Sequence, residues 1–447
     1  MLKHYLKTAF KVFLRRKFVT LVNLLGICGT LVVLLLAAAE VDRGLGAYAP
    51  EVNADRTLKV SSVVLSGDHC FGGSGGAGYL FADRYARRLQ TPEKVALCAR
   101  GTQSAILYQG DTKLTLGRKE VDAAYWEVLR FSFVEGQPFS AQDVAEERPV
   151  AIISRRTRRQ VFGEGPALGK TLETLAGNYQ VVGVVENVPR FQSTSGADFW
   201  VPLKQEQRRW GGLASEAGLV GDLQILLLAR DPSELPRLKA EYQAMLSQVD
   251  LSAVPNCGLY SAADTRFESE MRLVLMRPEA QSVLRAIDPG NESARFGMTM
   301  VDDESLQYAK AIWVVEFAGG TLLFMLFPAL HLVNLNLSRI LERGPEIGVR
   351  RAFGASSRAL VGQFLVEHLL LTAIGGLLSL PIAAGVLAVL SWEEWGGWAE
   401  SPQVTLSYPV FLFGLVFVLV FGVLAGIYPA WRMSRLHPAA VLGRGGP

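Results

Sequence analysis

The sequence predicts a membrane protein in which four transmembrane α-helices carry a large external α+β domain of about two lobes, inserted between helices 1 and 2. Three observations support this fold class. Half of the 447 residues are apolar while 19% are charged, a mixture typical of several membrane spans joined to a soluble part. The apolar residues gather in four long runs, and residues 40–310 separate the first two runs. Among the termini and the short loops, basic residues lie on one side of the predicted membrane.

The four apolar runs are long enough to cross a bilayer. The runs 18–39, 369–390 and 409–431 carry no charged residue. The run 311–333 contains only Glu316 and His331 among titratable groups. Each exceeds the roughly 20 residues that cross a hydrocarbon core of about 30 Å. The first run is too long for a cleavable signal peptide, so we expect it to remain in the protein. We therefore expect transmembrane helices at 18–39, 311–333, 359–391 with an amphipathic lead-in, and 409–431.

The distribution of charge orients these helices. Basic residues without acids fill residues 1–17, and arginines recur in 334–358 and 432–447, whereas the short 392–408 loop holds glutamates and no base. The positive-inside rule therefore predicts that both termini and the 334–358 loop are cytoplasmic. Residues 40–310 are then external, in a periplasm or an extracellular space. A net charge of only +3 gives no reason to expect a nucleic-acid partner.

Four cysteines bear on the external domain. Cys28 lies within the first apolar run, whereas Cys70, Cys98 and Cys257 lie in the external region, where disulfides persist. The candidate bridge is Cys70–Cys98, and the alternative is that the three thiols are free or paired otherwise. The absence of Cys-x-x-Cys pairs and of clustered histidines predicts no metal site. No catalytic signature occurs either, so we expect no enzymatic activity from this chain alone.

The segment GEGPALGKT, residues 163–171, ends like a nucleotide-binding P-loop. A P-loop has four residues between its first glycine and the Gly-Lys pair, but five residues separate Gly163 from Gly169. A P-loop also follows a strand and opens a helix. Here a charged segment that reads as a helix comes first, and a valine-rich segment that reads as a strand comes after. We therefore expect an external helix-to-strand turn rather than an ATP site.

The external region alternates short strands and helices. Apolar alternation and β-branched residues predict the strands, and helical spacing of apolar residues predicts the helices. The expected strands are 57–65, 94–99, 104–109, 112–117, 149–154, 179–186, 198–203 and 222–229. The expected helices are 79–89, 121–131, a basic helix that ends at 162, and 233–246.

The predicted cytoplasmic loop contains a short charged segment between two breaks. Gly344–Pro345 interrupts the chain, Gly354 ends the segment, and Ser356–Ser357 can cap the next helix, which is amphipathic and continues into the third span. A solvated loop would explain the arginines, but it would not explain a charged helix between these breaks.

This segment carries a resemblance to a known family. The stretch PEIGVRRAFGASSRALVGQFLVEHLLLTAIGGLLSL resembles the signature of the MacB/FtsX-type (type VII) ABC transporter permeases. Three further stretches are similar to the same family: LKTAFKVFLRRKFVTLVNLLGI near the N-terminus, VFGEGPALGKTLETLAGNYQVVGVVENVP in the external region, and GIYPAWRMSRLHPAAVLG near the C-terminus. The resemblance covers the whole expected topology. It implies a location in the bacterial inner membrane, with residues 40–310 in the periplasm and a stalk helix at each end of them.

The resemblance implies a permease without a fused ATPase domain, since residues 1–17 and the residues after the last span leave no room for one. ATP and Mg would then bind a separate ABC ATPase subunit, with no cofactor on this chain. A second permease chain, identical or different, is implied, and a periplasmic adaptor and an outer-membrane channel are further candidate partners. The implied ATPase-coupling residues are Glu346, Ile347, Gly348, Val349, Arg350, Arg351, Phe353, Gly354 and Ala355.

The family's mechanism is mechanotransmission, in which ATP-driven motion passes through stalks that extend the first two spans to the periplasmic domains. The expected stalks are 40–48 and 303–313, and the expected outcome is export or extraction of periplasmic or outer-leaflet substrates. The alternative is an FtsX-like regulator that activates a periplasmic enzyme without transport. The N-terminal segment is expected to be a helix on the membrane surface, or else simple positive-inside flanking. Its candidate residues are Lys3, Lys7, Lys11, Phe10 and Phe13.

Overall fold

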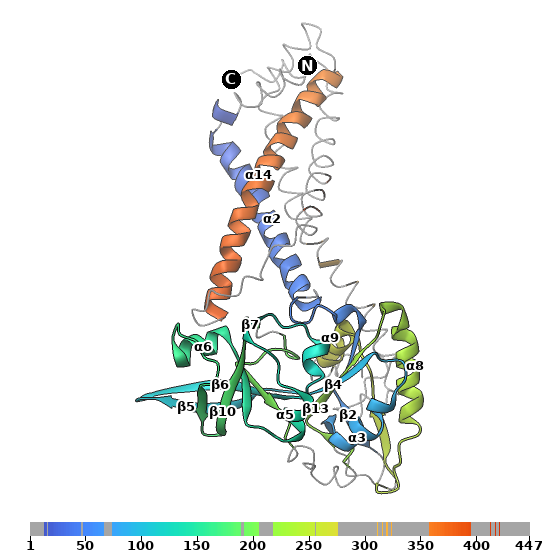
Figure 1. The fold of residues 1–447 in the computed structure, drawn as a ribbon. Coiled ribbons are helices and arrows are strands. Elements are labelled where there is room, and N and C mark those ends of the chain that lie inside the picture. The colour runs from blue at the N-terminus through green and yellow to red at the C-terminus, as the bar shows by residue number, and fades with distance from the viewer. Residues whose placement is uncertain are drawn as a thin grey trace. The chain divides into compact units, whose positions relative to one another are not determined.

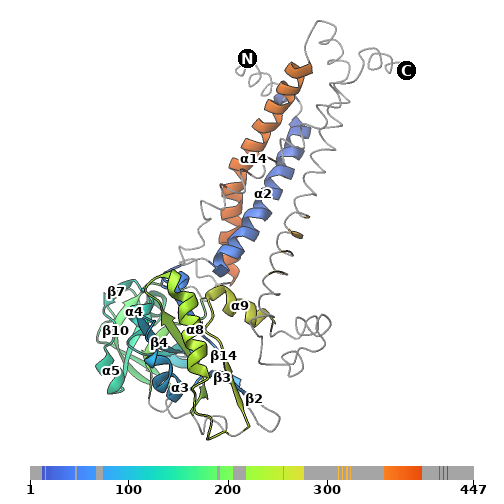
Figure 2. The same cartoon turned by 90° about the vertical axis from the view of Figure 1, so that its right-hand side faces the viewer.

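The computed structural model describes two separate units (Figures 1 and 2). One unit comprises residues 1–46 and 312–447, and the other comprises residues 47–311. The described residues are 13–15, 17–45, 48–66, 74–188, 192–204, 218–254, 256–275 and 357–394, with the single residues 311, 315, 319, 320, 323, 412, 416 and 420.

The first unit is built on two long helices that lie side by side, α2 (Lys17–Leu45) and α14 (Ser357–Glu394) (Figures 1 and 2). Each contains a stretch long and apolar enough to cross a membrane, Thr20–Ala37 in α2 and Leu369–Val389 in α14. As expected, α14 starts at Ser357 and continues without a break into the third predicted span. Most of the other two predicted spans lies outside the described residues, so the number of four stays a prediction.

The two helices pack through small groups of apolar side chains. Ile27 and Leu31 of α2 are buried against Leu371 of α14, and further along Val32 and Leu35 are buried against Ala383. Lipid tails are as apolar as these side chains, so close packing and interhelical hydrogen bonds must hold such a pair together.

Gly375 provides the closest approach between the helices. The Cys28 thiol donates a hydrogen bond to the Gly375 carbonyl oxygen, with 3.2 Å between sulfur and oxygen. A Cβ atom at position 375 would lie 2.6 Å from Cγ2 of Ile27, which belongs to a stiff β-branched side chain. Gly385 on the same helix has open space around its Cα atom, because no atom lies within 4 Å of a Cβ built there.

We expect Gly375→Ala to lower the melting temperature of the purified chain in detergent. The added methyl group would overpack the helix contact, at a cost of about 1–3 kcal/mol. The matched control is Gly385→Ala, which adds the same methyl group to the same helix. It should be neutral or slightly stabilising, since alanine favours a helix over glycine by about 1 kcal/mol. Equal melting temperatures for the two variants would contradict the close approach at Gly375.

The second unit contains a mixed sheet of 14 strands among the described residues. Its main path runs β14-β2-β3-β13-β4-β6-β11-β8-β10-β7, while β1 pairs with β13, β12 with β3, β5 with β6 and β9 with β10. The β8–β10 and β6–β11 pairs are parallel, and the other pairs are antiparallel. The strands are β1 (Thr57–Val60), β2 (Val63–Ser66), β3 (Ser74–Ala77), β4 (Lys94–Ala99), β5 (Gln103–Gln109), β6 (Thr112–Val121), β7 (Phe133–Gly136), β8 (Val150–Ser154), β9 (Thr171–Thr174), β10 (Gly177–Val185), β11 (Phe199–Pro202), β12 (Val220–Gly221), β13 (Leu223–Leu228) and β14 (Gly258–Ser261).

Short helices complete this unit. The longest are α8, which buries one face against the sheet, and α9, which is the last described helix before the chain returns toward the first unit. The α-helices are α3 (Tyr79–Arg84), α4 (Tyr125–Val128), α5 (Ala141–Ala145), α6 (Arg155–Phe162), α8 (Leu235–Leu246) and α9 (Arg266–Leu275). The 3-10 helices are η1 (Ala54–Arg56), η2 (Ala86–Arg88) and η4 (Pro232–Glu234).

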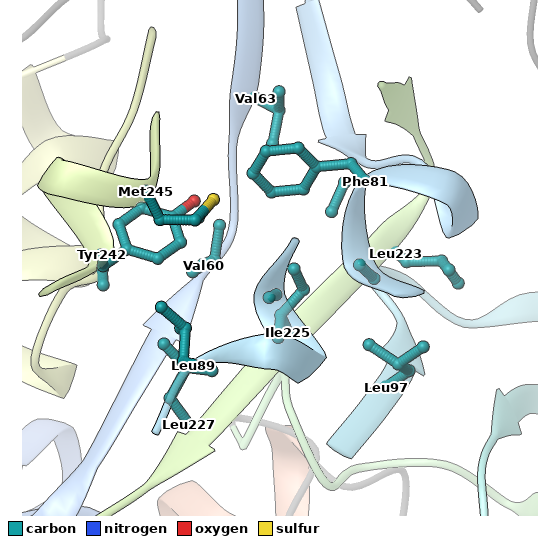
Figure 3. Packing of buried hydrophobic residues seen from close by; sticks show 14 of the residues in the cluster. Val60, Val63, Phe81, Leu89, Leu97, Leu223, Ile225, Leu227, Tyr242 and Met245 are labelled. Carbon is teal, nitrogen blue, oxygen red and sulfur yellow. The ribbon is translucent and has the colours of Figure 1, made fainter. Parts of the chain in front are cut away.

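Strand β13 separates the cores of two lobes. All six of its residues are buried, and successive side chains of a strand point to opposite faces. Leu223, Ile225 and Leu227 therefore enter the core of the first lobe, whereas Leu226 and Leu228 enter that of the second. Figure 3 shows the first core, where Phe81 of α3 and Tyr242 and Met245 of α8 lie in one cluster with these residues of β13. The same cluster contains Val60, Val63, Leu89 and Leu97.

The second lobe has a core on each face of the sheet. On β11, Trp200 packs into one cluster with Trp126 of α4, while Phe199 and Val201 pack into another cluster beside Leu172. The prediction of an α+β domain with about two lobes therefore agrees with the described part of this unit.

The expected strands and helices are found, with three differences, the first being that the 79–89 helix is divided at Tyr85 into α3 and η2. The 57–65 strand is broken at Ser61–Ser62 into β1 and β2, and the 121–131 helix is reduced to the single turn α4. Strands β3, β7, β9, β12 and β14 were not expected. They are short, and several contain glycine, so their sequences carry little strand signal.

The predicted Cys70–Cys98 disulfide is wrong. Cys98 is a free thiol with no exposed surface, and Cys257 is disulfide-bonded. Cys98 lies on β4, where its side chain enters the core of the second lobe and its thiol donates to Oε1 of Gln224 at 3.7 Å. Cys70 itself lies outside the described residues.

Candidate functional site

The candidate site is the place where the chain enters and leaves the external unit. Helix α2 ends at Leu45, and residues 48–56, which we call the entry segment, lead into β1. At the other end of the unit, the chain passes from β14 into α9. The entry segment, β1 and the start of α9 meet in a buried group of charged side chains, which we call the junction. Its members are Glu51, Lys59, Asp264, Arg266 and Arg272.

Backbone hydrogen bonds join the segment just before α9 to the first strand. The amide nitrogen of Lys59 donates to the carbonyl oxygen of Asp264 at 2.7 Å, and the amide of Asp264 donates back at 2.9 Å. The Asp264 carboxylate also accepts from Nε of Arg272 on α9 at 2.7 Å. The start of α9 is therefore fixed to β1 although about two hundred residues of chain separate them.

The centre of the junction is the carboxylate of Glu51, whose side chain is 3% exposed. Its Oε2 atom lies 3.2 Å from Nζ of Lys59 and 3.9 Å from Nη1 of Arg266, and its Oε1 atom accepts from the hydroxyl of Ser195 at 2.8 Å. A buried charge is tolerated only when it is paired and hydrogen-bonded, and here both conditions are met.

Burial and charge act in opposite directions on the acids of the junction. Burial raises the pKa of Glu51, but Lys59, Arg266 and the Ser195 hydroxyl outweigh it, so the pKa is lowered from its ordinary value. For Asp264, burial dominates over the nearby Arg272, and its pKa is raised. Glu51 is therefore the carboxylate that the surroundings hold firmly in its charged form.

Further bonds connect the entry segment to both lobes. The Asn53 amide donates to the carbonyl oxygen of Val128 at 3.0 Å, and the amide of Arg130 donates to the Pro50 carbonyl at 2.9 Å, both next to α4 in the second lobe. Nη1 of Arg56 donates to the carbonyl of Ala229 at 2.8 Å, at the end of β13. The entry segment is thus bonded along its whole length to the strands and helices that follow it.

The arrangement is suited to holding chain segments together rather than to chemistry. The Glu51 carboxylate is paired with Lys59 and Arg266 and accepts a hydrogen bond from the Ser195 hydroxyl. Within the same residues, no three His, Cys, Asp or Glu side chains are grouped as a metal site.

The GEGPALGKT segment is a helix-to-strand turn, as expected. It follows α6 and precedes β9, with Gly163 and Gly169 at positive φ angles of 73° and 77°. Nζ of Lys170 lies over the ring of Phe162, 5.5 Å from its centroid. The arginines of α6 are all paired with acids, so this helix offers no free basic surface; the pairs are Arg155–Glu186, Arg156–Asp198, Arg158–Glu135 and Arg159–Glu164.

Most residues of the predicted sites lie outside the described residues. This applies to the coupling segment 346–355 and to Lys3, Lys7, Phe10 and Lys11. Phe13 is described, and its side chain is buried in the cluster of Ile27, Leu31 and Leu371. The junction was missed by the sequence analysis, and its one visible signal was Lys59, a charge in the middle of an apolar predicted strand.

Two family models match the chain. The MacB-like periplasmic core domain matches residues 20–245, and the FtsX-like permease C-terminal domain matches residues 319–438. The chain belongs to the MacB/FtsX-type ABC transporter permeases. The permease has a MacB-like periplasmic domain followed by an FtsX-like membrane region, and its two described apolar helices fit the inner-membrane location of the family.

Curated relatives carry matching names. Over 322 residues the permease is 25% identical to the "Macrolide export ATP-binding/permease protein MacB" of Chromobacterium violaceum, covering 72% of this chain and 42% of that protein. It is 23% identical over 322 residues to the "Uncharacterized ABC transporter permease YvrN" of Bacillus subtilis, covering 72% of this chain and 68% of that one. The aligned region therefore spans less than half of the MacB relative.

Solved structures of external domains are also similar. The periplasmic region of MacB from Actinobacillus actinomycetemcomitans matches 52% of this chain and 95% of its own, with 15% identity and a TM-score of 0.34. The extracellular domain of YknZ from Gram-positive bacteria matches 45% and 98%, with 13% identity and a TM-score of 0.33.

We expect Glu51→Gln to reduce the free energy of unfolding of the external unit by about 3 kcal/mol, because it removes one partner of a buried ion pair. The matched control is Glu127→Gln, which breaks the exposed Lys94–Glu127 pair, 2.7 Å long. That change should cost less than about 1 kcal/mol, since surface pairs contribute little. Chemical unfolding of the purified permease measures both values, and equal losses would show that the junction does not stabilise the fold.

The effect of Glu51→Gln should depend on pH. Because the pKa of Glu51 is lowered on folding, its carboxylate stabilises the protein above the ordinary value of 4.5, and this stabilisation is lost as the pH falls below that value. The difference in melting temperature between wild type and Glu51→Gln should therefore shrink as the solution is acidified below pH 4.5. Other acids titrate in both proteins and cancel in the comparison. A difference that stays constant would contradict a charged Glu51.

Proposed function

We propose that this permease couples ATP hydrolysis on a separate ATPase subunit to motion of its periplasmic domain, and so drives export or extraction of substrates from the periplasm or outer leaflet. The observation that carries the proposal is the junction. Glu51, Lys59 and Arg266 bind the entry segment, β1 and α9 to one another, so that a shift of the entry segment acts on both β1 and α9.

The physical argument follows the chain. Helix α2 continues past its apolar stretch to Leu45, and a helix is stiff enough to carry a displacement from one end to the other. Only five residues separate the end of this helix from Glu51. Because β1 pairs with β13 along its whole length, a force at the junction acts on the central strand of the sheet rather than on a loose linker.

An ATPase partner is implied by the family, and we propose that it binds the 346–355 segment. Arg350, Arg351 and Glu346 would make the charged contacts, with apolar contacts from Ile347, Val349 and Phe353. ATP and Mg would bind that subunit. The name of the MacB relative joins ATP binding and permease in one protein, and this chain aligns with 42% of that protein. The name of YvrN mentions a permease and no ATP binding. We propose the YvrN-like arrangement here.

The remaining organisation is proposed in the same way. Four transmembrane helices, cytoplasmic termini and a second permease chain, identical or different, would complete the complex, with a periplasmic adaptor and an outer-membrane channel as candidate partners. The name of the Chromobacterium relative, a macrolide exporter, suggests a hydrophobic substrate. The match of the MacB-like periplasmic core domain to residues 20–245 supports export over an FtsX-like regulatory role.

We expect Arg350→Glu combined with Arg351→Glu to abolish copurification of the ATPase and to lower permease-dependent ATP hydrolysis at least about tenfold. Reversed charges placed against an acidic surface cost several kcal/mol. The matched control is Arg339→Glu with Arg343→Glu, which makes the same charge change in the same cytoplasmic loop outside the coupling segment and should leave hydrolysis nearly unchanged. Normal assembly of the first variant would refute the coupling assignment.

A further inference from the structure

A buried polar turn at residues 192–196 connects the entry segment to the second lobe. The turn is closed by a hydrogen bond from the Gly196 amide to the Gln192 carbonyl at 2.6 Å. Gln192, Thr194 and Ser195 are each at most 1% exposed, although all three side chains are polar. Ser193 is exposed, and polar side chains of an irregular turn are normally solvated, so the burial of these three requires an explanation.

One side of the turn is bonded to the entry segment and β1. Nε2 of Gln192 donates to the carbonyl oxygen of Tyr48 at 3.2 Å. The Ser195 hydroxyl donates to Glu51 at 2.8 Å, and Nζ of Lys59 donates to Oγ1 of Thr194 at 2.6 Å. The turn therefore provides hydrogen-bond partners for both Glu51 and Lys59 of the junction.

The other side of the turn is bonded to three elements of the second lobe. Consecutive carbonyl oxygens of Ser193, Thr194 and Ser195 accept from three buried donors. These donors are Nζ of Lys119 on β6 at 2.8 Å, the hydroxyl of Tyr125 on α4 at 3.1 Å, and Nε1 of Trp200 on β11 at 3.2 Å.

The donors are unusual for such a place. Lys119 has no exposed surface, and burial lowers its pKa, which means that the fold bears a cost to keep an ammonium group there. An apolar core would hold the two lobes together without that cost. Directional bonds from three elements to three consecutive carbonyls instead fix the position and orientation of the turn relative to the second lobe.

We propose that the 192–196 turn transfers displacements of the entry segment to β6, α4 and β11, which makes Ser195, Lys119 and Tyr125 positioning residues for coupling. This inference rests on the proposed function, because it concerns how ATP-driven motion reaches the second lobe. The contacts of Asn53 and Arg130 near α4 provide a parallel connection, so loss of the turn's bonds should weaken the transfer rather than abolish it.

The test compares two double variants with the same chemical deletions. Tyr125→Phe with Ser195→Ala removes one phenol hydroxyl and one serine hydroxyl from the turn. Tyr242→Phe with Ser261→Ala removes the same two groups from the first lobe, where these hydroxyls lie 2.7 Å apart and Ser261 also donates to Ser62. Each permease is assembled in nanodiscs with the ATPase that copurifies with it, and backbone hydrogen exchange is measured with and without ATP.

In the wild type, ATP should change exchange in peptides covering 57–60, 119–128 and 198–203. In the Tyr125/Ser195 variant, we expect the change at 57–60 and the ATPase rate to persist, while the change in the other two peptides falls by more than half. The Tyr242/Ser261 variant should respond like the wild type even if its melting temperature falls equally. If the double variant does not fold, Tyr125→Phe alone is compared with Tyr242→Phe.

Two other outcomes have separate meanings. An undiminished response of all three peptides in the Tyr125/Ser195 variant would overturn the role of the turn and leave the proposed function intact. No response to ATP in the wild-type complex would overturn the proposed function, and the inference with it.

Discussion

The external unit depends on one buried carboxylate at the point where the chain enters it. Glu51 has almost no contact with water, yet Lys59 and Arg266 keep it charged. Each of these three residues comes from a different part of the chain: the entry segment, the first strand β1 and helix α9. Removal of the Glu51 carboxylate would take this counter-charge from both Lys59 and Arg266, so electrostatics helps to hold three segments that are distant along the chain.

The arrangement of the lobes depends on strands that bury apolar side chains on both faces. Every residue of β13 is buried, so the strand supplies the first core with one set of leucines and the second core with the other. Strand β11 does the same for the two cores of the second lobe. Because β1 pairs with β13, the junction is bonded directly to the strand that the two lobes share.

The sequence predicted these strands because they are rich in apolar and β-branched residues. The prediction failed where the apolar pattern does not show which face of the strand a residue occupies. In KVALCA every residue is apolar or small apart from the first, so alternation cannot show which face Cys98 occupies, and the disulfide prediction was wrong. Strands such as β3 and β14 contain glycine and few apolar residues, and only pairing with neighbours makes them strands. Glu51 follows a proline in a short irregular segment, where no periodic pattern exists to mark a buried charge.

The choice of polar contacts in this region bears on function. An apolar interface stabilises a contact over a range of relative positions, since the hydrophobic effect is non-directional. Hydrogen bonds and ion pairs weaken steeply when their angle or distance changes, so a segment held by them transmits small shifts instead of absorbing them. The bonds that Lys59, Ser195 and Lys119 make are costly to bury and could be replaced by apolar packing if stability alone were required. Their presence between the entry segment and the sheet is what a structure needs when the position of its first strand must follow the end of a membrane helix.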